Sequence, residues 1–471
     1  MVQAQEKLGV QLTGLNLAEL TEEEANKIYE QGREAVVFVL LKLAQKLAEQ
    51  EQSPSTPSAM IAVYQKPAVR TNGKTPGQKD GHDGVRRASP VKIDQYQEHR
   101  LKSCPQCGGE VSKPARTRKR IIEDIPQVEP VVTEHTIHGS YCSRCEKIVE
   151  PVVADALPGA TIGNNLVALT AWLHYGLGNT LSQIVSVLNY HLQFKISEGG
   201  LIGMWNRLHE ILYVWYEQIA EEARKAGVLH ADETGWRVSG ITHWLWCFTT
   251  QTTSYYMIDK SRGKAALMKF FTEAFEGILI TDFWAAYDRI TAGLKQKCMV
   301  HLFREIEKVL VRNKSPAWLA FSKKLKRLLR DTLRLKKRDD VSEQQYASRR
   351  ERFDVRLDEI LQQQWEDADA QRIVKRLTKY REDLFTFLDH DDVPADNNHA
   401  EREIRPAVII RKNSLCNRSQ DGADMQAVLM SVYRTLKLRG INPIQTIAMA
   451  LRIYVQTGKV PPLPTIPTSL G

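Results

Sequence analysis

The feature that most constrains the fold is a change of hydrophobic period at Val228. Before it, apolar residues recur at helical spacing from Gly163 to Gly227. After it come strand candidates separated by short turns, at residues 228–238, 243–250 and 253–259. A helix candidate at 264–274, a strand at 277–282 and a last strand at 296–303 follow. Three meandering strands and then alternating helices and strands predict an RNase H-like mixed α/β core.

Two carboxylates lie on strand candidates that should be buried. Asp232 is on the first strand and Asp282 ends the fourth, and these strands are neighbours in an RNase H-like sheet. A carboxylate at the mouth of a buried strand is costly unless it is paired, hydrogen-bonded or bound to a cation. The two together therefore indicate a cation site. Glu233 should face the other side of the strand.

The third acid is expected from the stretch Asp396–Pro406, which reads DNNHAEREIRP. Asn397, Glu401 and Arg405 recur every four residues and share one stripe of a helix. Glu403 lies about 200° further round, so we select Glu401 as the third acid. A solvated helix end is the alternative for these residues taken alone.

Four of the seven cysteines form two C-x2-C pairs: Cys104 with Cys107, and Cys142 with Cys145. Two such pairs complete a tetrahedral zinc site of four thiolates, whereas a redox dithiol needs only one pair. An odd number of cysteines in a long chain does not suit an extracellular disulfide framework. We therefore predict a zinc ribbon with structural Zn²⁺ at 100–150, with a strand at 131–138.

The charge balance favours a polyanionic partner such as nucleic acid. Lysine and arginine total 65 against 56 acidic residues, a net charge of +9. Basic residues gather in the zinc ribbon, at Arg116, Arg118, Lys119 and Arg120, and on one face of a later helix, at Lys323, Arg327, Arg330 and Arg334. We expect both groups to contact DNA phosphates. An exposed, solvated helix face is the alternative for the second group.

The N-terminal part is predicted to be a helix followed by a basic linker. A capping box at Thr21–Glu24 begins a helix expected to reach Gln52, and its coiled-coil-like seam suits either a dimer contact or packing in its own domain. Residues 53–92 are basic and rich in proline and glycine. The longest apolar run, Ala35–Leu41, is far too short to span a membrane, so we expect an intracellular protein without membrane contact.

A helix pair is predicted ahead of the strands. A helix at 181–192 and a second at 201–216, with Ser197 as N-cap, resemble a helix-turn-helix reader of DNA. The second helix has an apolar stripe and few basic residues, which favours a packed spacer. Between the second and third acids, helical periodicity from Leu302 to about Leu388 predicts an all-helical insertion.

Four separated motifs occur in one order: HADETGWRV, GILITDFWAAYD, QKCMVHLFREI and DNNHAEREIRP. Together they resemble the transposases of the insertion sequence 66 family, bacterial mobile-element enzymes with a DDE catalytic triad. The resemblance implies that Asp232, Asp282 and Glu401 are catalytic. It also implies that the partners are double-stranded DNA, both element terminal inverted repeats and target, and small accessory proteins. A cytoplasmic, nucleoid-associated homodimer is the expected form.

Strand transfer requires in-line attack at phosphorus, which two Mg²⁺ (or Mn²⁺) ions held by the three acids would assist. Further residues are expected near this site: Arg405, Arg411 and Lys412 on phosphate, and His301, Asn397 and Trp284 in support. A core position is the alternative for His301, expected on the strand at 296–303, and for Trp284.

Two other functions remain open from the sequence. A zinc-ribbon DNA-binding regulator with an inactive core is one, and an RNase H-like nuclease without strand transfer is the other. The expected organisation is multidomain α+β: an N-terminal helical segment (1–52), basic linker (53–99), zinc ribbon (100–150), helical domain (151–227), first part of the core (228–303), helical insertion (304–392), second part of the core (393–455) and tail (456–471).

Overall fold

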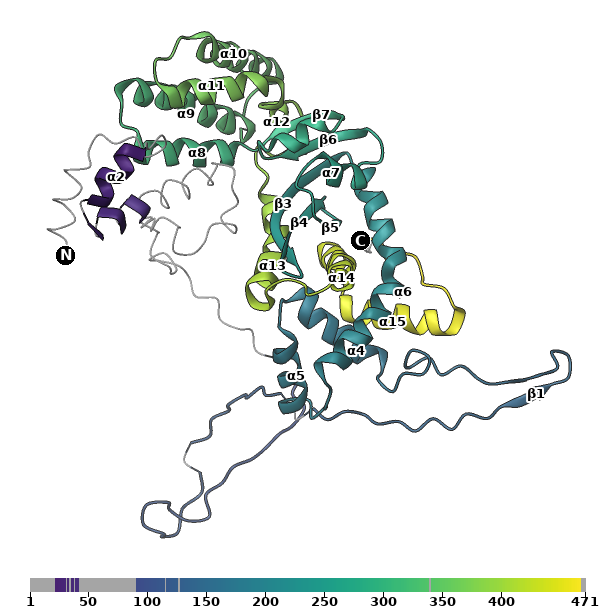
Figure 1. Ribbon diagram of the computed structural model, residues 1–471. Helices are drawn as coiled ribbons and strands as arrows, with labels where there is room; N and C mark the ends of the chain where they lie inside the picture. Colours follow the sequence, from purple (N-terminus) through teal and green to yellow (C-terminus); the bar gives the residue numbers. More distant parts are fainter. Residues whose placement is uncertain are drawn as a thin grey trace.

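The computed structural model describes residues 22–30, 32–33, 35–37, 39–41, 90–114, 116–125, 128–338 and 340–466. At its centre is a five-stranded mixed sheet in the order β5-β4-β3-β6-β7 (Figure 1). The strands are β3 (Val228–Val238), β4 (Ile241–Thr249), β5 (Ser254–Asp259), β6 (Phe275–Thr281) and β7 (Ala292–Lys297). β3, β4 and β5 are antiparallel, while β6 is parallel to β3 and β7 is parallel to β6. The expected pairing of the first and fourth strands, β3 and β6, is confirmed.

The predicted strand at 296–303 is wrong. β7 ends at Lys297, and helix α8 (Met299–Arg312) begins two residues later. The apolar side chains of this run, Met299, Leu302, Ile306 and Val309, are all buried at helical spacing. A short apolar run does not by itself distinguish a strand from the first turn of a helix. His301 therefore lies on a helix.

Helices cover both faces of the sheet. α13 (Asn398–Ser414) packs on β3 and β4, where Ile404 and Ala407 meet Trp236 and Leu245. On the other face, α7 (Lys264–Phe270) stacks Phe270 on Phe248 of β4, with ring centroids 4.0 Å apart. Because alternate residues of β3 face opposite layers, Asp232 and Glu233 enter different environments.

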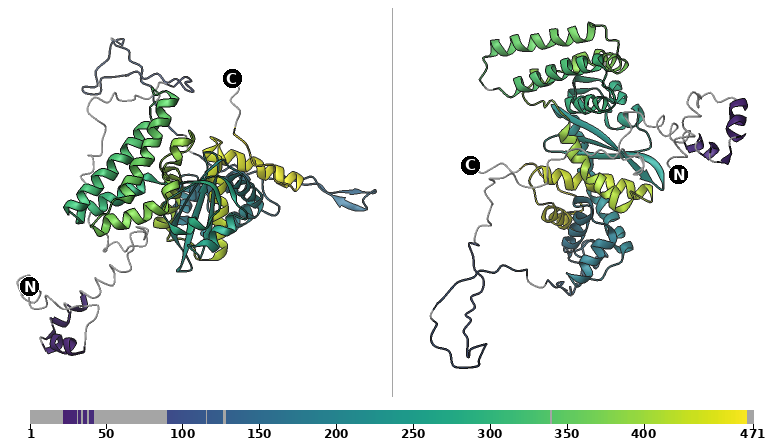
Figure 2. Two further views of the ribbon diagram at one scale, coloured as in Figure 1. Left: turned by 90° about the horizontal axis from the view of Figure 1, so that it is seen from above. Right: turned by 90° about the vertical axis from the view of Figure 1, so that its left-hand side faces the viewer.

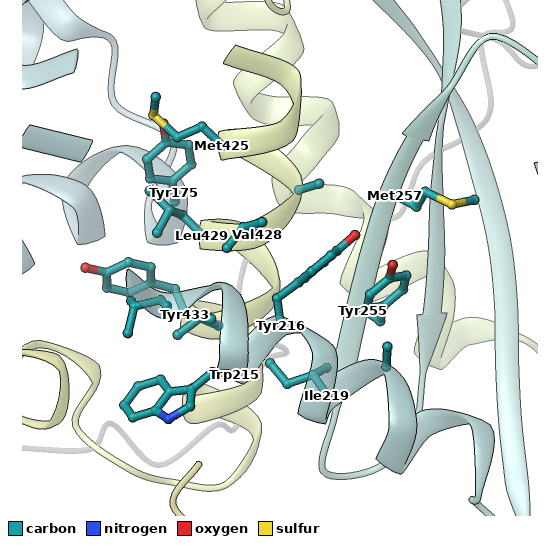
Figure 3. Close-up of a cluster of buried hydrophobic side chains, with 14 of the residues drawn as sticks. Tyr175, Trp215, Tyr216, Ile219, Tyr255, Met257, Met425, Val428, Leu429 and Tyr433 are labelled. Atoms are coloured by element: carbon teal, nitrogen blue, oxygen red, sulfur yellow. The ribbon is translucent and has the colours of Figure 1, made fainter. Parts of the chain in front are cut away.

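The outer edge of the sheet is closed by α14 (Gln420–Leu438). The amides of Ser254 and Tyr256 on edge strand β5 donate to Thr435 Oγ1 and Ser431 Oγ at 3.0 and 2.9 Å. α14 also packs on α6 (Glu198–Arg224), and Tyr216 of α6 stacks on Tyr255 of β5 (Figure 3). Two hydroxyl oxygens of α14 therefore accept from backbone amides that the edge strand would otherwise present to solvent.

The helix pair ahead of the sheet forms as predicted. α4 (Asn164–Ala171), a π-helical turn (Trp172–Gly176), α5 (Leu181–Tyr190) and α6 (Glu198–Arg224) follow one another. Ser197 Oγ accepts from the amide of Gly200 at 3.1 Å and caps α6. The apolar stripe of α6 is buried: Leu201, Trp205, Leu208, Leu212 and Trp215 are at most 1% exposed. That stripe belongs to the core, as a packed spacer requires.

The predicted helical insertion is present between β7 and α13. It comprises α8, α9 (Pro316–Lys336), α10 (Glu343–Gln362), α11 (Ala368–Lys379) and α12 (Thr386–Asp389). Its hydrophobic core is built around Trp318, Phe321 and Leu357 and also includes Ile280 of β6. Figures 1 and 2 show the sheet between this insertion and the layer of α4, α6 and α15 (Pro443–Thr457).

The cysteine-rich segment is extended. Its strands are β1 (Ser140–Cys142) and β2 (Lys147–Val149), which form a hairpin around the second cysteine pair. The predicted strand at 131–138 is wrong: Val131 and Val132 are more than 90% exposed, and no partner strand from the described part of the chain pairs with them. Alternation alone does not make a strand without a partner to pair with.

At the N-terminus, α2 (Glu22–Glu30) begins where the capping box predicts. The expected single helix to Gln52 is interrupted at Gly32, whose φ is +93°. Residues 42–52 and most of the basic linker lie outside the described residues. None of the described helices is long and apolar enough to cross a membrane.

Candidate active site and zinc-finger segment

Asp232 lies on the face of β3 that meets the start of α13. On the same face, His230 Nδ1 is 2.9 Å from Asn397 Oδ1. The Asp232 carboxylate is partly buried and accepts from the amide of Glu233 at 2.9 Å. This bond comes from the adjacent backbone and compensates only weakly for the burial of a charge.

Glu233 points to the opposite face, as expected. Arg262 donates to its Oε1 from two nitrogens at 2.9 and 3.0 Å, and the Tyr287 hydroxyl donates to Oε2 at 2.6 Å. Burial is the main cause that raises the pKa of Glu233, with Asp282 adding to it. Both of its oxygens accept hydrogen bonds from protein side chains, so Glu233 has a structural role on the opposite face of the sheet.

Asp282 follows directly after β6, and its turn is held from two sides. Its Oδ1 accepts from the amide of Trp284 at 2.8 Å. The buried ammonium of Lys297 donates to Thr281 Oγ1 at 3.0 Å and to the carbonyl of Asp282 at 3.1 Å. Desolvation lowers the pKa of Lys297. The lysine fixes the backbone from which the Asp282 carboxylate projects.

Glu401 lies in the first turn of α13, which Asn397 anchors. Asn397 is fully buried, and its Nδ2 donates to the carbonyl of Ala231 at 2.8 Å. Its own amide donates to the sulfur of Cys298, just before α8, at 3.2 Å. One asparagine thus joins β3, α8 and α13, which brings Glu401 beside the strand that carries Asp232.

The Glu401 carboxylate is held by α8. Arg304 Nη1 donates to Oε1 at 2.9 Å and Nη2 to Oε2 at 3.2 Å. His301 Nε2 lies 3.7 Å from the same Oε1. His301 and Arg304 are three residues apart and share a helix face, so α8 presents both side chains to Glu401.

The three acids lie in one electrostatic environment. The pKa of Asp232 is raised well above its usual range, first by desolvation and then by the charges of Glu233, Asp282 and Glu401. A partly buried carboxylate with this much uncompensated negative charge nearby suits a divalent cation with oxygen ligands. Within the part of the chain that the structure describes, however, no three acidic, histidine or cysteine side chains are arranged to hold one metal ion. The donors are of the right chemical type, and Glu401 is turned to Arg304.

Glu403, the acid that the helical stripe excludes from the triad, is in the core. It is 4% exposed, and Arg434 of α14 binds both of its oxygens at 2.7 and 3.0 Å. Its stripe of α13 therefore faces β5 and α14, and both of its oxygens are bound by protein donors.

Several residues expected to support the site have other contacts. Trp284 packs on the guanidinium of Arg262, 3.9 Å from its ring centroid, and donates to the Arg262 carbonyl. Arg411 donates to Thr234 Oγ1 at 3.0 Å and to the carbonyl of Gly235, and burial lowers its pKa. Trp284 thus packs in the sheet layer and Arg411 fastens α13 to β3. Arg405 and Lys412 are exposed.

The basic face of α9 is exposed as the sequence predicts. Lys323, Arg327, Arg330 and Arg334 lie on the surface, while Phe321, Leu325, Leu328 and Leu329 are buried. Arg334 lies 3.5 Å from Asp331, whereas Lys323, Arg327 and Arg330 form no ion pair with any acid among the described residues. Arg116, Arg118, Lys119 and Arg120 are also exposed, on the extended segment.

Each cysteine pair forms a knuckle, but the two knuckles lie far apart. In the first, the amide of Gly108 donates to the carbonyl of Cys104 at 2.8 Å, with Gly108 at φ +73°. Hydrogen bonds from within each knuckle, mainly from backbone amides, lower the pKa of Cys104 and Cys142, which favours thiolate ligands. Figures 1 and 2 show the β1 hairpin on the opposite side of the molecule from the loop that follows residue 90. Metal binding and folding are coupled in sites of this kind, so one ion would bind all four thiolates only if the two knuckles came together.

Arg304 and Lys297 are functional candidates that reasoning from the sequence did not identify. Arg304 is three residues after His301, and their common face is visible only once this stretch is known to be a helix. Lys297 is the last residue of β7, two positions before α8. Nothing in the surrounding sequence indicates that its side chain is completely buried.

Comparison with known proteins gives an independent result. The sequence profile described as "Transposase IS66 family" matches residues 159–425, and that of the "zinc-finger binding domain of transposase IS66" matches residues 102–146, which contain both cysteine pairs. Two relatives from Sinorhizobium fredii are uncharacterized proteins: y4qI is 25% identical over 55% of this chain and 53% of its own length, and y4jD is 22% identical over 77% of each. The chain thus spans about half the length of the first relative. Since the first profile covers more than half of the sequence, the chain belongs to the IS66 transposase family, with its zinc-finger domain.

Proposed function

We propose that this chain is a DNA transposase that cleaves and joins DNA through the acids Asp232, Asp282 and Glu401. The observation that carries the proposal is the placement of three acids: Asp232 is on β3, Asp282 directly follows the neighbouring parallel strand β6, and Glu401 is in the first turn of α13, which packs on β3. The strand order β5-β4-β3-β6-β7 is the order expected of an RNase H-like core, in which acids on the first and fourth strands are neighbours. The division of the chain into a zinc ribbon, a helical domain, a two-part core and a helical insertion is part of this proposal.

The acids are assigned as ligands of two Mg²⁺ or Mn²⁺ ions, which when bound would activate the attacking oxygen and stabilise the leaving oxygen. The chain's own residues prepare that site. Asn397 places the first turn of α13 against β3, and Lys297 holds the Asp282 turn. The exposed basic residues of α9 and of the extended segment are assigned to DNA phosphates, and Cys104, Cys107, Cys142 and Cys145 to one structural Zn²⁺.

The test uses DNA duplexes carrying an element end. D232N and E401Q should bind these duplexes like wild type and lose at least about a hundredfold in cleavage rate, because each removes a ligand of the reacting centre. E307Q is the matched control, since Glu307 is an exposed acid of α8 paired with Lys326. Cleavage retained by E401Q would remove Glu401 from the triad.

A nuclease of the same fold is the second candidate. Both activities need the same acids, so only the product distinguishes them. A transposase joins the freed 3′ end to a second duplex, and a nuclease does not. A DNA-binding regulator is disfavoured because all three acids are present on matching elements. A homodimer, accessory proteins and a cytoplasmic, nucleoid-associated location remain proposals of the family resemblance.

A further inference from the structure

The ion pair between Arg304 and Glu401 differs from the other carboxylate–arginine pairs around the sheet. Glu233–Arg262 and Glu403–Arg434 are buried, with carboxylate side chains 2% and 6% exposed. In the Arg304–Glu401 pair the side chains are 51% and 28% exposed. Two hydrogen bonds give it a defined geometry, yet water reaches both partners. Partly exposed pairs of this kind are weak and can exchange partners.

The charge of Asp232 acts on Arg304 in addition to that of its partner Glu401. The pKa of Arg304 is raised first by hydrogen bonds to Glu401, and the charge of Asp232 adds to the effect. The guanidinium therefore lies in the field of two of the three acids. A positive charge at this place neutralises part of the acidic cluster while no other cation is present.

The position of Arg304 is fixed by its helix. The amide of Met299 donates to the carbonyl of Ala395 at 2.9 Å, and the sulfur of Cys298 accepts from Asn397. The first turn of α8 is thus bound to the segment that leads into α13. The arginine side chain is long and exposed, so it can turn while the backbone stays in place.

We propose that Arg304 holds Glu401 until divalent cations bind, and that the released guanidinium then binds a phosphate of the DNA. A guanidinium remains charged, and its planar fork fits a carboxylate or a phosphate equally well. Arg304 occupies one acceptor site on each Glu401 oxygen and places a positive charge against the carboxylate, so a divalent cation that approaches the same oxygens is repelled and competes with the arginine. The phosphate to be cut must lie beside the same acids, within reach of the arginine that was displaced. This inference rests on the proposed function of the three acids.

The first measurement is Mn²⁺ binding to the full chain, followed by electron paramagnetic resonance. R304Q should strengthen Mn²⁺ binding by about two- to fivefold, the range that a weak, partly exposed ion pair implies. R304K should lie between R304Q and wild type, because it keeps the charge and loses the fork. R312Q is the matched control: Arg312 is on the same helix and pairs with Asp369 in the insertion, and its loss should leave Mn²⁺ binding unchanged.

The second measurement is the salt dependence of binding to a duplex without element ends. With Mg²⁺, R304Q should lower the slope of log affinity against log salt by about 0.9, the value for one phosphate neutralised. With EDTA the slopes of R304Q and wild type should agree, because Arg304 is then bound to Glu401.

Failure of this inference and failure of the proposed function give different results. If D232N weakens Mn²⁺ binding while R304Q changes neither Mn²⁺ affinity nor the Mg²⁺ slope, Arg304 is a structural ion-pair partner and the inference is overturned. If wild type does not bind Mn²⁺, or D232N binds it equally well, the assignment of the acids fails first.

Discussion

At the scale of single residues, the charge of Asp232 should destabilise the metal-free protein. Its pKa is raised in the folded state, so the folded chain binds more protons than the unfolded chain above the ordinary value of 3.8. Stability from this group is therefore lost as pH rises from about 4 toward the raised pKa. D232N should be more stable than wild type at neutral pH in EDTA, by about 1–3 kcal/mol or several degrees in the melting temperature.

Thermal unfolding at pH 4 and pH 7.5 tests this. The difference between D232N and wild type should shrink at pH 4, where Asp232 is protonated in the folded state and close to half protonated in the unfolded state. E307Q, which removes an exposed acid, should show no such dependence. An equal effect of D232N at both pH values would mean that the asparagine acts through packing and not through charge.

Asn397 gives a second prediction at this scale. N397A leaves the carbonyl of Ala231 and the ring of His230 without their partner inside the core. Unmade buried hydrogen bonds cost about 1–3 kcal/mol, so the free energy of unfolding should fall by that amount. Cleavage should fall further than stability explains, because α13 also positions Glu401. If activity at a temperature where N397A is fully folded equals that of wild type, Asn397 has no positioning role.

At this scale the sequence predicts which face of α13 each glutamate occupies, while the catalytic role of Glu401 stays a prediction. The helical stripe separated Glu401 from Glu403, and the structure places Glu403 in a buried pair with Arg434. Helical period is a local property, so it could be read without the fold. The contact between Arg304 and Glu401 spans 97 residues, and no local pattern encodes it.

At the scale of elements, α14 should determine the stability of the sheet edge. S431A/T435A removes the acceptors for the amides of Ser254 and Tyr256 on β5. Each buried amide left unpaired costs about 1–3 kcal/mol, and these two amides should exchange hydrogen faster. The control is S186A, because the exposed Ser186 hydroxyl donates to the carbonyl of Ser182 within α5, just as the Ser431 hydroxyl donates to the carbonyl of Ala427 within α14. Unchanged exchange at both amides would show that α14 covers the edge by packing alone.

The elements themselves were predictable where their periodicity was long. β3, with eleven residues of strand pattern, has the predicted bounds Val228–Val238, and the N-cap of α6 is the predicted Ser197. The stretch at 296–303 was assigned wrongly because one apolar run straddles the end of β7 and the first turn of α8. The stretch at 131–138 alternates without a partner strand, and pairing is a property that sequence pattern does not contain.

At the scale of the whole molecule, the exposed face of α9 should contribute to DNA binding. K323Q/R327Q/R330Q should weaken binding to any duplex. The slope of log affinity against log salt concentration should become shallower by up to about 3, roughly one for each phosphate that is no longer neutralised. K308Q/K437Q/K459Q removes the same charge from exposed lysines elsewhere. If both triple variants weaken binding equally, net charge and not the α9 face is responsible.

The two cysteine knuckles give the prediction that most changes the shape of the molecule. One tetrahedral ion can bind all four thiolates only if the β1 hairpin and the Cys104 knuckle come together, and each knuckle already favours thiolates. Co²⁺ should therefore bind at one ion per chain with the absorption of a four-thiolate site. C104S/C107S and C142S/C145S should each abolish that spectrum. Two Co²⁺ ions per chain, each abolished by only one of the double variants, would show that the knuckles bind metal separately and that the segment does not close.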